Sequence, residues 1–247
     1  MYHKKSPIYP SALFDALLKI TKLNSESKIL EVGSANSLAT LPLVTKGLNV
    51  TSVEFMTYSE PAAKKKQEIV FKNVSLDEAQ LSQNSFDFIY ATKPLYCLIN
   101  DTYLDKVYTL LKANAKLAII EIKPVFESKN IYFDALRKTL LKEIYNYDAN
   151  KIERLTCLNT FSAKKDAFNK LANPIFYTEY LYNLEKYEAF IKTFPEFKNL
   201  PTEKQQKILT LIKESFMQAE TDLLFSSKYA FELILLEKKE PQLKLYV

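Results

Sequence analysis

Glycine is nearly missing from this chain: the 247-residue sequence contains only Gly33 and Gly47, whereas an average chain is about 7 % glycine. Because glycine readily supplies the positive φ angles of sharp turns, these two positions indicate where the chain needs such turns. Gly33 ends the apolar run Lys28-Ile-Leu-Glu-Val-Gly33 and precedes Ser-Ala-Asn-Ser-Leu-Ala-Thr40. The pattern predicts a strand followed by a sharp turn into a helix, where α/β folds bind nucleotides.

Cysteine and histidine are also scarce. Cys97 and Cys157 lie sixty residues apart without a second pair or a histidine cluster, so the sequence predicts neither a disulfide framework nor a zinc site. The only histidine, His3, lies at the N-terminal end, and no Ser-His-Asp or Cys-His nucleophile system can be assembled from it. We expect no bound metal.

Long apolar runs are absent. The longest, such as Ala230-Phe-Glu-Leu-Ile-Leu-Leu236, have the length of a strand and fall far short of the ~20 residues of a membrane helix. Residues 1–6 carry two lysines without an apolar stretch behind them, which is not typical of a secretory signal. We therefore expect a cytoplasmic protein that does not associate with a membrane.

Arginine is almost absent although the formal net charge is +5, because Arg137 and Arg154 are the only two arginines. Proteins that read nucleic acids favour arginine for bidentate contacts, whereas lysine is scattered here over most expected helices. The run Lys64-Lys-Lys66 is best interpreted as a solvated helix face. A base-flipping Asn-Pro-Pro-Tyr motif is also absent, since Thr92-Lys-Pro-Leu-Tyr96 occupies that place. No nucleic-acid partner is expected.

Apolar periodicity in the first half alternates between helical and extended patterns. Helices are expected at 11–20, 37–46 and 101–111, and strands at 28–32, 49–55, 69–72, 86–91 and 116–123. Strands separated by helices require crossover connections, which indicate a parallel, doubly wound sheet. Residues 127–171 are expected to be helical, followed by a strand at 175–181, helices at 184–194 and 202–217, and a strand at 228–236.

The resulting prediction is an α/β fold: a Rossmann-like, doubly wound, mostly parallel seven-stranded sheet with helices on both faces and a helical C-terminal lid. Residues 1–125 would form the cofactor-binding core, and residues 126–225 a mostly helical lid or substrate region with a sixth strand near 173–181. Residues 226–247 would supply the closing strand of the same sheet, within a single domain.

A strand that ends in glycine and leads into a helix offers backbone N–H groups to a polar ligand. Glu54 ends the following strand 21 residues after Gly33, close to the spacing of about 20 expected for an acid that binds a ribose. Together these features predict a nucleoside cofactor. They do not separate a nicotinamide dinucleotide from S-adenosylmethionine.

Residues 30–54 resemble the first cofactor motif of class I S-adenosylmethionine-dependent methyltransferases, L-E-x-G-x-G-x-G followed by A-T and x-G-x-x-V-x-x-x-E. Residues 86–98, Phe-Asp-Phe-Ile-Tyr-Ala-Thr-Lys-Pro-Leu-Tyr-Cys-Leu, are similar to the family's fourth-strand motif, and residues 110–121 to the segment before its fifth strand. Residues 7–10 and 187–194 resemble segments of the type 11 branch, which includes trans-aconitate methyltransferase-like enzymes. The resemblance covers nearly the whole chain.

The departures from the family pattern concern glycine. Ala35 and Ser37 replace the second and third glycines of the turn, and Ala113-Asn-Ala115 replaces Pro-Gly-Gly before the fifth strand. Ala35 would narrow the site, whereas Ser37 can cap the following helix. Asn36 and Asn114 can adopt positive φ at modest cost.

The resemblance implies a cofactor site for S-adenosylmethionine. The turn would line the methionine and ribose parts through Gly33, Ser34, Ala35 and Asn36, with Glu31 ordering it. Glu54 would bind the ribose hydroxyls and Phe55 would lie against the adenine, with Leu76 and Asp77 on its other side. The transferred methyl group would be faced by Ala91 and Thr92, and Tyr9 would cover the cofactor.

Tyr96 stands where the family often has a histidine. With an ordinary pKa near 10, tyrosine is a poor base at neutral pH, but proximity and alignment can supply most of the acceleration of a methyl transfer. Tyr96 is the only candidate catalytic residue. The expected function is methylation of O, N or C in a small molecule; the alternative is an inactive methyltransferase-fold binding or scaffold protein. The sequence does not predict an oligomeric state.

Overall fold

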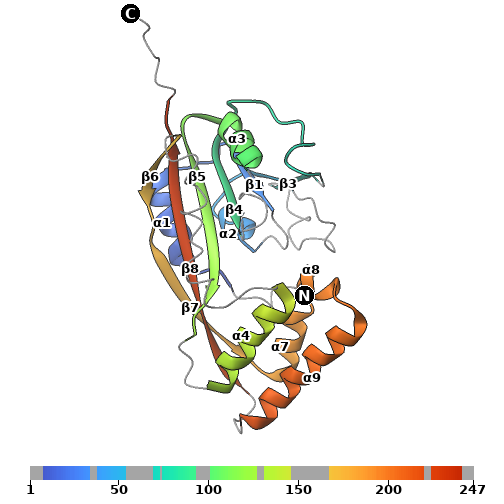
Figure 1. Cartoon of the computed structure of the whole chain (residues 1–247). Helices are drawn as coiled ribbons and strands as arrows, with labels where there is room; N and C mark the ends of the chain where they lie inside the picture. The colour runs from blue at the N-terminus through green and yellow to red at the C-terminus, as the bar shows by residue number, and fades with distance from the viewer. Residues whose placement is uncertain are drawn as a thin grey trace, which may run out of the picture. The chain divides into compact units, whose positions relative to one another are not determined.

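The computed structural model describes residues 8–33, 38–53, 69–72, 74–92, 101–126, 131–145, 167–219 and 224–240. The chain divides into two compact units (Figure 1). We call them the sheet unit, which comprises Tyr9–Ile122, Cys157–Phe176 and Phe231–Val247, and the helical unit, which comprises Met1–Ile8, Lys123–Thr156 and Tyr177–Ala230.

Helices and strands alternate in the first half of the chain, as predicted. They are α1 (Ser11–Thr21), β1 (Ile29–Val32), α2 (Thr40–Val44), β2 (Val50–Val53), β3 (Ile69–Lys72), β4 (Phe86–Thr92), α3 (Asp101–Leu110) and β5 (Leu111–Pro124). The second half contains α4 (Ile131–Tyr145), β6 (Phe168–Ala172), β7 (Ile175–Tyr182), α7 (Leu184–Ile191), α8 (Pro195–Lys198), α9 (Thr202–Gln218) and β8 (Phe225–Lys238). Three long strands, β5, β7 and β8, contribute residues to both units.

The strands form one sheet in the order β3-β2-β1-β4-β5-β8-β6, and β7 pairs with β8 off this path. Seven strands lie on this path and β7 is an eighth among the described residues; the seven predicted strands included β7 but not β6. The pairs from β3 to β5 are parallel, whereas β6 and β8 are antiparallel. The sheet is therefore mixed, with a parallel half built from the crossover units that the sequence predicts.

One predicted helical stretch is wrong: β6 is a strand, although residues 127–171 read as helical. Its backbone pairs with β8 in the register Phe168↔Lys238 and Asn169↔Glu237, and such cross-strand pairing overrides a weak local preference. Pro174 separates β6 from β7 because proline has no N–H to donate. Its carbonyl still accepts a hydrogen bond from the Leu233 N–H at 3.0 Å.

Helix α2 is shorter than the expected helix at 37–46. In the described residues it covers only Thr40–Val44, because Pro42 fits only near the start of a helix. Turn residues follow the helix, and Gly47 among them has φ +82°. The second glycine thus adopts the left-handed conformation that is common just after helices.

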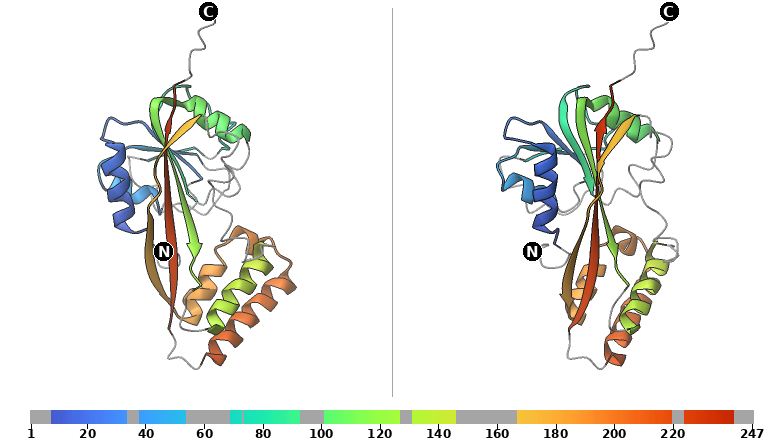
Figure 2. Two further views of the ribbon diagram at one scale, coloured as in Figure 1. Left: turned by 60° about the vertical axis from the view of Figure 1, so that its left-hand side comes forward. Right: turned by 90° about the vertical axis from the view of Figure 1, so that its left-hand side faces the viewer.

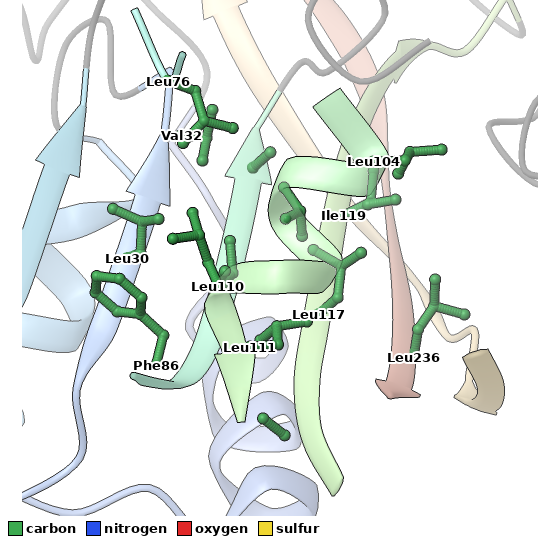
Figure 3. Packing of buried hydrophobic residues seen from close by; sticks show 14 of the residues in the cluster. Leu30, Val32, Leu76, Phe86, Leu104, Leu110, Leu111, Leu117, Ile119 and Leu236 are labelled. Atoms are coloured by element: carbon green, nitrogen blue, oxygen red, sulfur yellow. The ribbon is translucent and has the colours of Figure 1, made fainter. Parts of the chain in front are cut away.

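Figure 2 shows α1 and α2 on one side of the sheet and α3 on the other. Alternate residues of a strand face opposite sides, and the side that faces α3 is aliphatic (Figure 3). This aliphatic cluster joins residues of the central strands with buried leucines of α3; its labelled members include Leu30, Val32, Leu104, Leu110, Leu117 and Ile119. The α3 side of the sheet is therefore ordinary packed core.

The helical unit has an aromatic core. The Phe133 ring stacks on Phe225 at 3.7 Å between centroids and meets Phe216 edge-on at 4.8 Å. Arg137 is only 4 % exposed, and its guanidinium donates to the carbonyl oxygens of Val125 at 2.9 Å and Lys228 at 3.3 Å. The described residues include no helix with the length and apolar character needed to cross a membrane.

Candidate functional site

The order of the parallel strands reverses between β1 and β4. From β1 the sheet continues through β2 to β3, and from β4 it continues to β5. Ligands of open α/β sheets bind outside the carboxyl ends of the strands at such a switch point. Here Gly33 follows the end of β1, and Thr92 ends β4.

Gly33 adopts φ +78°, a conformation that residues with a Cβ rarely take. Its N–H donates to the Val53 carbonyl oxygen at 3.0 Å, which fixes the turn against β2. A Cβ built on Gly33 would meet no other atom within 4 Å among the described residues. The positive φ predicted for the start of the turn is confirmed at Gly33, and no described residue occupies the space beside it.

Three polar side chains form a row across the sheet, one or two residues before the strands end. Glu31 of β1 is paired in register with Ser52 of β2 and with Tyr90 of β4, and residues in register on parallel strands face the same side. All three are fully buried. We call Ser52, Glu31 and Tyr90 the polar row; it lies on the side of the sheet opposite the aliphatic cluster.

Thr40, the first residue of α2, contacts the polar row. Its hydroxyl donates to Glu31 Oε2 at 2.5 Å, and both residues are fully buried. The Tyr90 hydroxyl lies beside Glu31 and Thr40 without the geometry of a full hydrogen bond to either. A buried carboxylate is costly unless donors or a positive charge compensate it, so the hydrogen bond from Thr40 stabilises Glu31.

Two tyrosine hydroxyls near Glu31 are held in the protonated form. Burial raises the pKa of Tyr90 well above its ordinary value of 10.0, and the negative charge of Glu31 raises it further. Burial likewise raises the pKa of Tyr9, opposed by a hydrogen bond with Thr92 and reinforced by Glu31. At neutral pH both groups act as hydrogen-bond donors and not as bases.

Tyr9 is buried at 8 % exposure just before α1. Its ring packs against Phe14 at 6.1 Å and against Phe231 of β8 at 5.1 Å. The hydrogen bond with Thr92 links its hydroxyl to the carboxyl end of β4. The residue predicted to cover the cofactor is thus placed beside the switch point.

The structure brings some predicted site residues together and separates others. Glu31, Gly33, Thr92 and Tyr9 gather at the switch point, as described above. Ala91 and Leu76 are buried in the aliphatic cluster, whereas Asp77 is exposed. Several other predicted site residues lie outside the described residues: Ser34, Ala35, Asn36, Glu54, Phe55 and Tyr96.

Ser52, Thr40 and Tyr90 were not predicted as site residues. A signal for them exists in the sequence, because Glu31, Ser52 and Tyr90 each interrupt an apolar strand at a position that should be core. Their meeting depends on the strand register, which joins positions 31, 52 and 90 into one row. In the described residues, no group of three or more His, Cys, Asp or Glu side chains could hold a metal ion.

Comparisons with known proteins agree with this geometry. Residues 30–119 match a family model described as "Methyltransferase domain", which confirms the resemblance to the type 11 methyltransferases. The matched segment contains β1, Gly33, the polar row and β4. No curated protein matches the chain at a significant level.

Solved structures share the fold over nearly the whole chain. A protein described as a type II methyltransferase from Anaeromyxobacter dehalogenans has a TM-score of 0.65 at 14% identity, covering 95% of this chain and 97% of its own. One described as a methyltransferase from Bacillus halodurans has a TM-score of 0.56 at 15% identity, covering 94% and 100%. The cyclase SpnF has a TM-score of 0.54 at 14% identity, covering 94% and 82%. At these identities the likeness shows the fold alone.

Proposed function

We propose that this chain, which carries a methyltransferase domain over residues 30–119, is an S-adenosylmethionine-dependent methyltransferase of small molecules. One observation carries the proposal: Gly33 has φ +78°, no described residue lies within 4 Å of a Cβ built on it, and it follows the buried Glu31 by two residues at the switch point of the sheet. A carboxylate held by hydroxyl donors suits a ligand that brings positive charge. We propose a soluble substrate, no nucleic-acid partner and a cytoplasmic location.

In this proposal the turn after β1 holds the methionine part of the cofactor. Gly33, with Ser34, Ala35 and Asn36 following it in the chain, would line that part, and Glu31 would order the turn. Glu54 would bind the ribose hydroxyls and Phe55 would lie against the adenine. Thr92, at the end of β4, would face the reacting atoms, and Tyr9 would hold Thr92 in place through their hydrogen bond.

The cofactor would supply a methyl group on a positively charged sulphur. The protein's contribution is alignment and exclusion of water, which can account for most of the rate of such a displacement. Because Tyr9 and Tyr90 stay protonated at neutral pH, we assign them donor and packing roles. Tyr96 remains the candidate for proton removal where the O, N or C acceptor requires it.

The two glycines provide a matched test. Both have positive φ, +78° at Gly33 and +82° at Gly47, and a Cβ on either would meet nothing within 4 Å. Alanine at either position should therefore cost a similar ~1 kcal/mol of backbone strain. Only Gly33→Ala adds a methyl group where we place the cofactor, so it should weaken S-adenosylmethionine binding about tenfold or more, measured by isothermal titration calorimetry.

Gly47→Ala should bind the cofactor like the unmodified protein. Equal affinities for the two variants would place the ligand away from Gly33. If the unmodified protein binds neither S-adenosylmethionine nor S-adenosylhomocysteine at millimolar concentration, the enzyme proposal fails and the binding or scaffold alternative is supported. Binding that is lost in Glu54→Ala would exclude that alternative.

A further inference from the structure

The proposed function gives the Tyr90 hydroxyl of the polar row a donor role but does not say which group receives the hydrogen bond. Tyr90 lies in the interior of β4, paired on one side with Glu31 and on the other with Ala118 of β5. It is fully buried, and its ring stacks on Phe88 at 5.7 Å. A phenylalanine would fill the same space without burying an oxygen.

A buried hydroxyl without full hydrogen-bond geometry lowers the stability of a fold. The Tyr90 oxygen is such a group, and it lies beside the Glu31 carboxylate and the Thr40 hydroxyl. Thr40 already donates to Oε2 of Glu31, so Tyr90 is placed to be a second donor to the same carboxylate. Two donors would fix the Glu31 side chain in one orientation and favour the ionised form of its carboxyl group.

We propose that Tyr90 is a positioning residue, whose hydroxyl acts with Thr40 to keep Glu31 ionised and oriented toward the Gly33 turn. This inference rests on the proposed function, because Glu31 is taken to order the turn that holds the cofactor. The groups shown facing Glu31 include Ser52 from β2, Thr40 from α2, Tyr90 from β4 and Tyr9 from the segment before α1.

The test compares the pH dependence of cofactor binding in the full-length protein and in Tyr90→Phe. Without the hydroxyl, Glu31 takes up a proton more readily, so the affinity of the variant should fall as the pH is lowered. We expect binding of S-adenosylmethionine to be about five- to tenfold weaker than in the unmodified protein near pH 6, and less than about twofold weaker near pH 8.

Tyr182→Phe is the matched control, since it removes another fully buried tyrosine hydroxyl, in the helical unit. Its binding profile should run parallel to that of the unmodified protein. If Tyr90→Phe does not fold, Thr40→Val removes the other donor and should show the same growing loss toward low pH.

The outcomes distinguish the positioning role of Tyr90 from the proposed function. If the unmodified protein binds the cofactor and Tyr90→Phe weakens binding by the same factor at every pH, or not at all, the positioning role is wrong and the proposed function stands. If the unmodified protein does not bind the cofactor at millimolar concentration, both fail together.

Discussion

The two units stabilise themselves with different chemistry. The sheet unit buries an aliphatic cluster on one side of its strands and a polar row on the other. The helical unit buries aromatic rings, among them Phe133, Tyr182 and Phe225, and the guanidinium of Arg137, which lies over the Tyr229 ring. Both units bury polar side chains, but the apolar cluster of the sheet unit is mainly aliphatic, whereas the core of the helical unit is aromatic.

In the helical unit some buried polar groups have partners within the core, although the buried Ser227 hydroxyl has none among the described residues. The Tyr182 and Tyr229 hydroxyls lie 3.3 Å apart, and Arg137 donates to two backbone carbonyls. In the sheet unit the Ser52 hydroxyl has no hydrogen-bond partner among the described residues. The Tyr90 hydroxyl has no partner there with full hydrogen-bond geometry. Natural proteins retain such costly groups mainly where function needs them. What distinguishes the polar row is that its members meet in one register at the switch point of the sheet.

The largest expected effect is on the aromatic core. Phe133 is fully buried between Phe216 and Phe225, so Phe133→Ala should lower the free energy of unfolding by about 3–5 kcal/mol. Urea unfolding followed by near-ultraviolet circular dichroism measures the loss. Phe133→Leu, which keeps most of the volume, should lose less than half as much; an equal loss in both would show that packing volume is not what Phe133 contributes.

A smaller loss is expected at a buried lysine of the sheet unit. Lys238 is 7 % exposed, and its ammonium donates to the carbonyls of Leu111 at 2.7 Å and Tyr108 at 2.8 Å, and to Asn84 Oδ1 at 3.3 Å. Lys238→Met leaves these acceptors near the end of α3 without their donor and should cost about 2–3 kcal/mol in urea unfolding.

The control for Lys238 is an exposed lysine. Lys46 forms an ion pair with Asp15 at 2.8 Å, and the side chains are 42% and 60% exposed. Solvent screens such a pair, so Lys46→Met should change the free energy of unfolding by no more than about 0.5 kcal/mol. Similar losses for the two variants would mean that the Lys238 hydrogen bonds contribute little.

The smallest effect concerns alkaline pH. Burial raises the pKa of Tyr182 and Tyr187 above 10.0. The unfolded chain therefore loses these protons near pH 10 while the folded protein keeps them, so stability is constant below that pH and falls above it. Each tyrosine should lower the free energy of unfolding by about 1 kcal/mol between pH 10 and pH 11, and by about 1.4 kcal/mol per pH unit above pH 11. Urea unfolding at several pH values should show a slope reduced by that amount in Tyr182→Phe; an unchanged slope would mean that Tyr182 ionises in the folded state.

The sequence predicted the local features well because their causes are local. Gly33 and Gly47 take the positive φ angles expected of them, and Asn114, at φ +57°, replaces a family glycine as expected. The strands from β1 to β5 follow their apolar patterns. The strand β6 could not be predicted, because its extended form depends on pairing with β8, about sixty residues later in the chain.

The candidate site shows the same division between features with local causes and features that depend on strand pairing. Glu31 and Gly33 are adjacent in a recognisable motif, so the sequence alone identified them and the family they indicate. Tyr90 and Ser52 become candidate site residues only through the strand register that aligns them with Glu31. Thr40 becomes one through its hydrogen bond to Glu31, which joins the start of α2 to β1. The sequence determined the positive φ of Gly33, because backbone conformation is set largely by the residue and its neighbours. The tertiary structure decided which buried oxygens meet the carboxylate, because strand pairing joins residues that the chain keeps far apart.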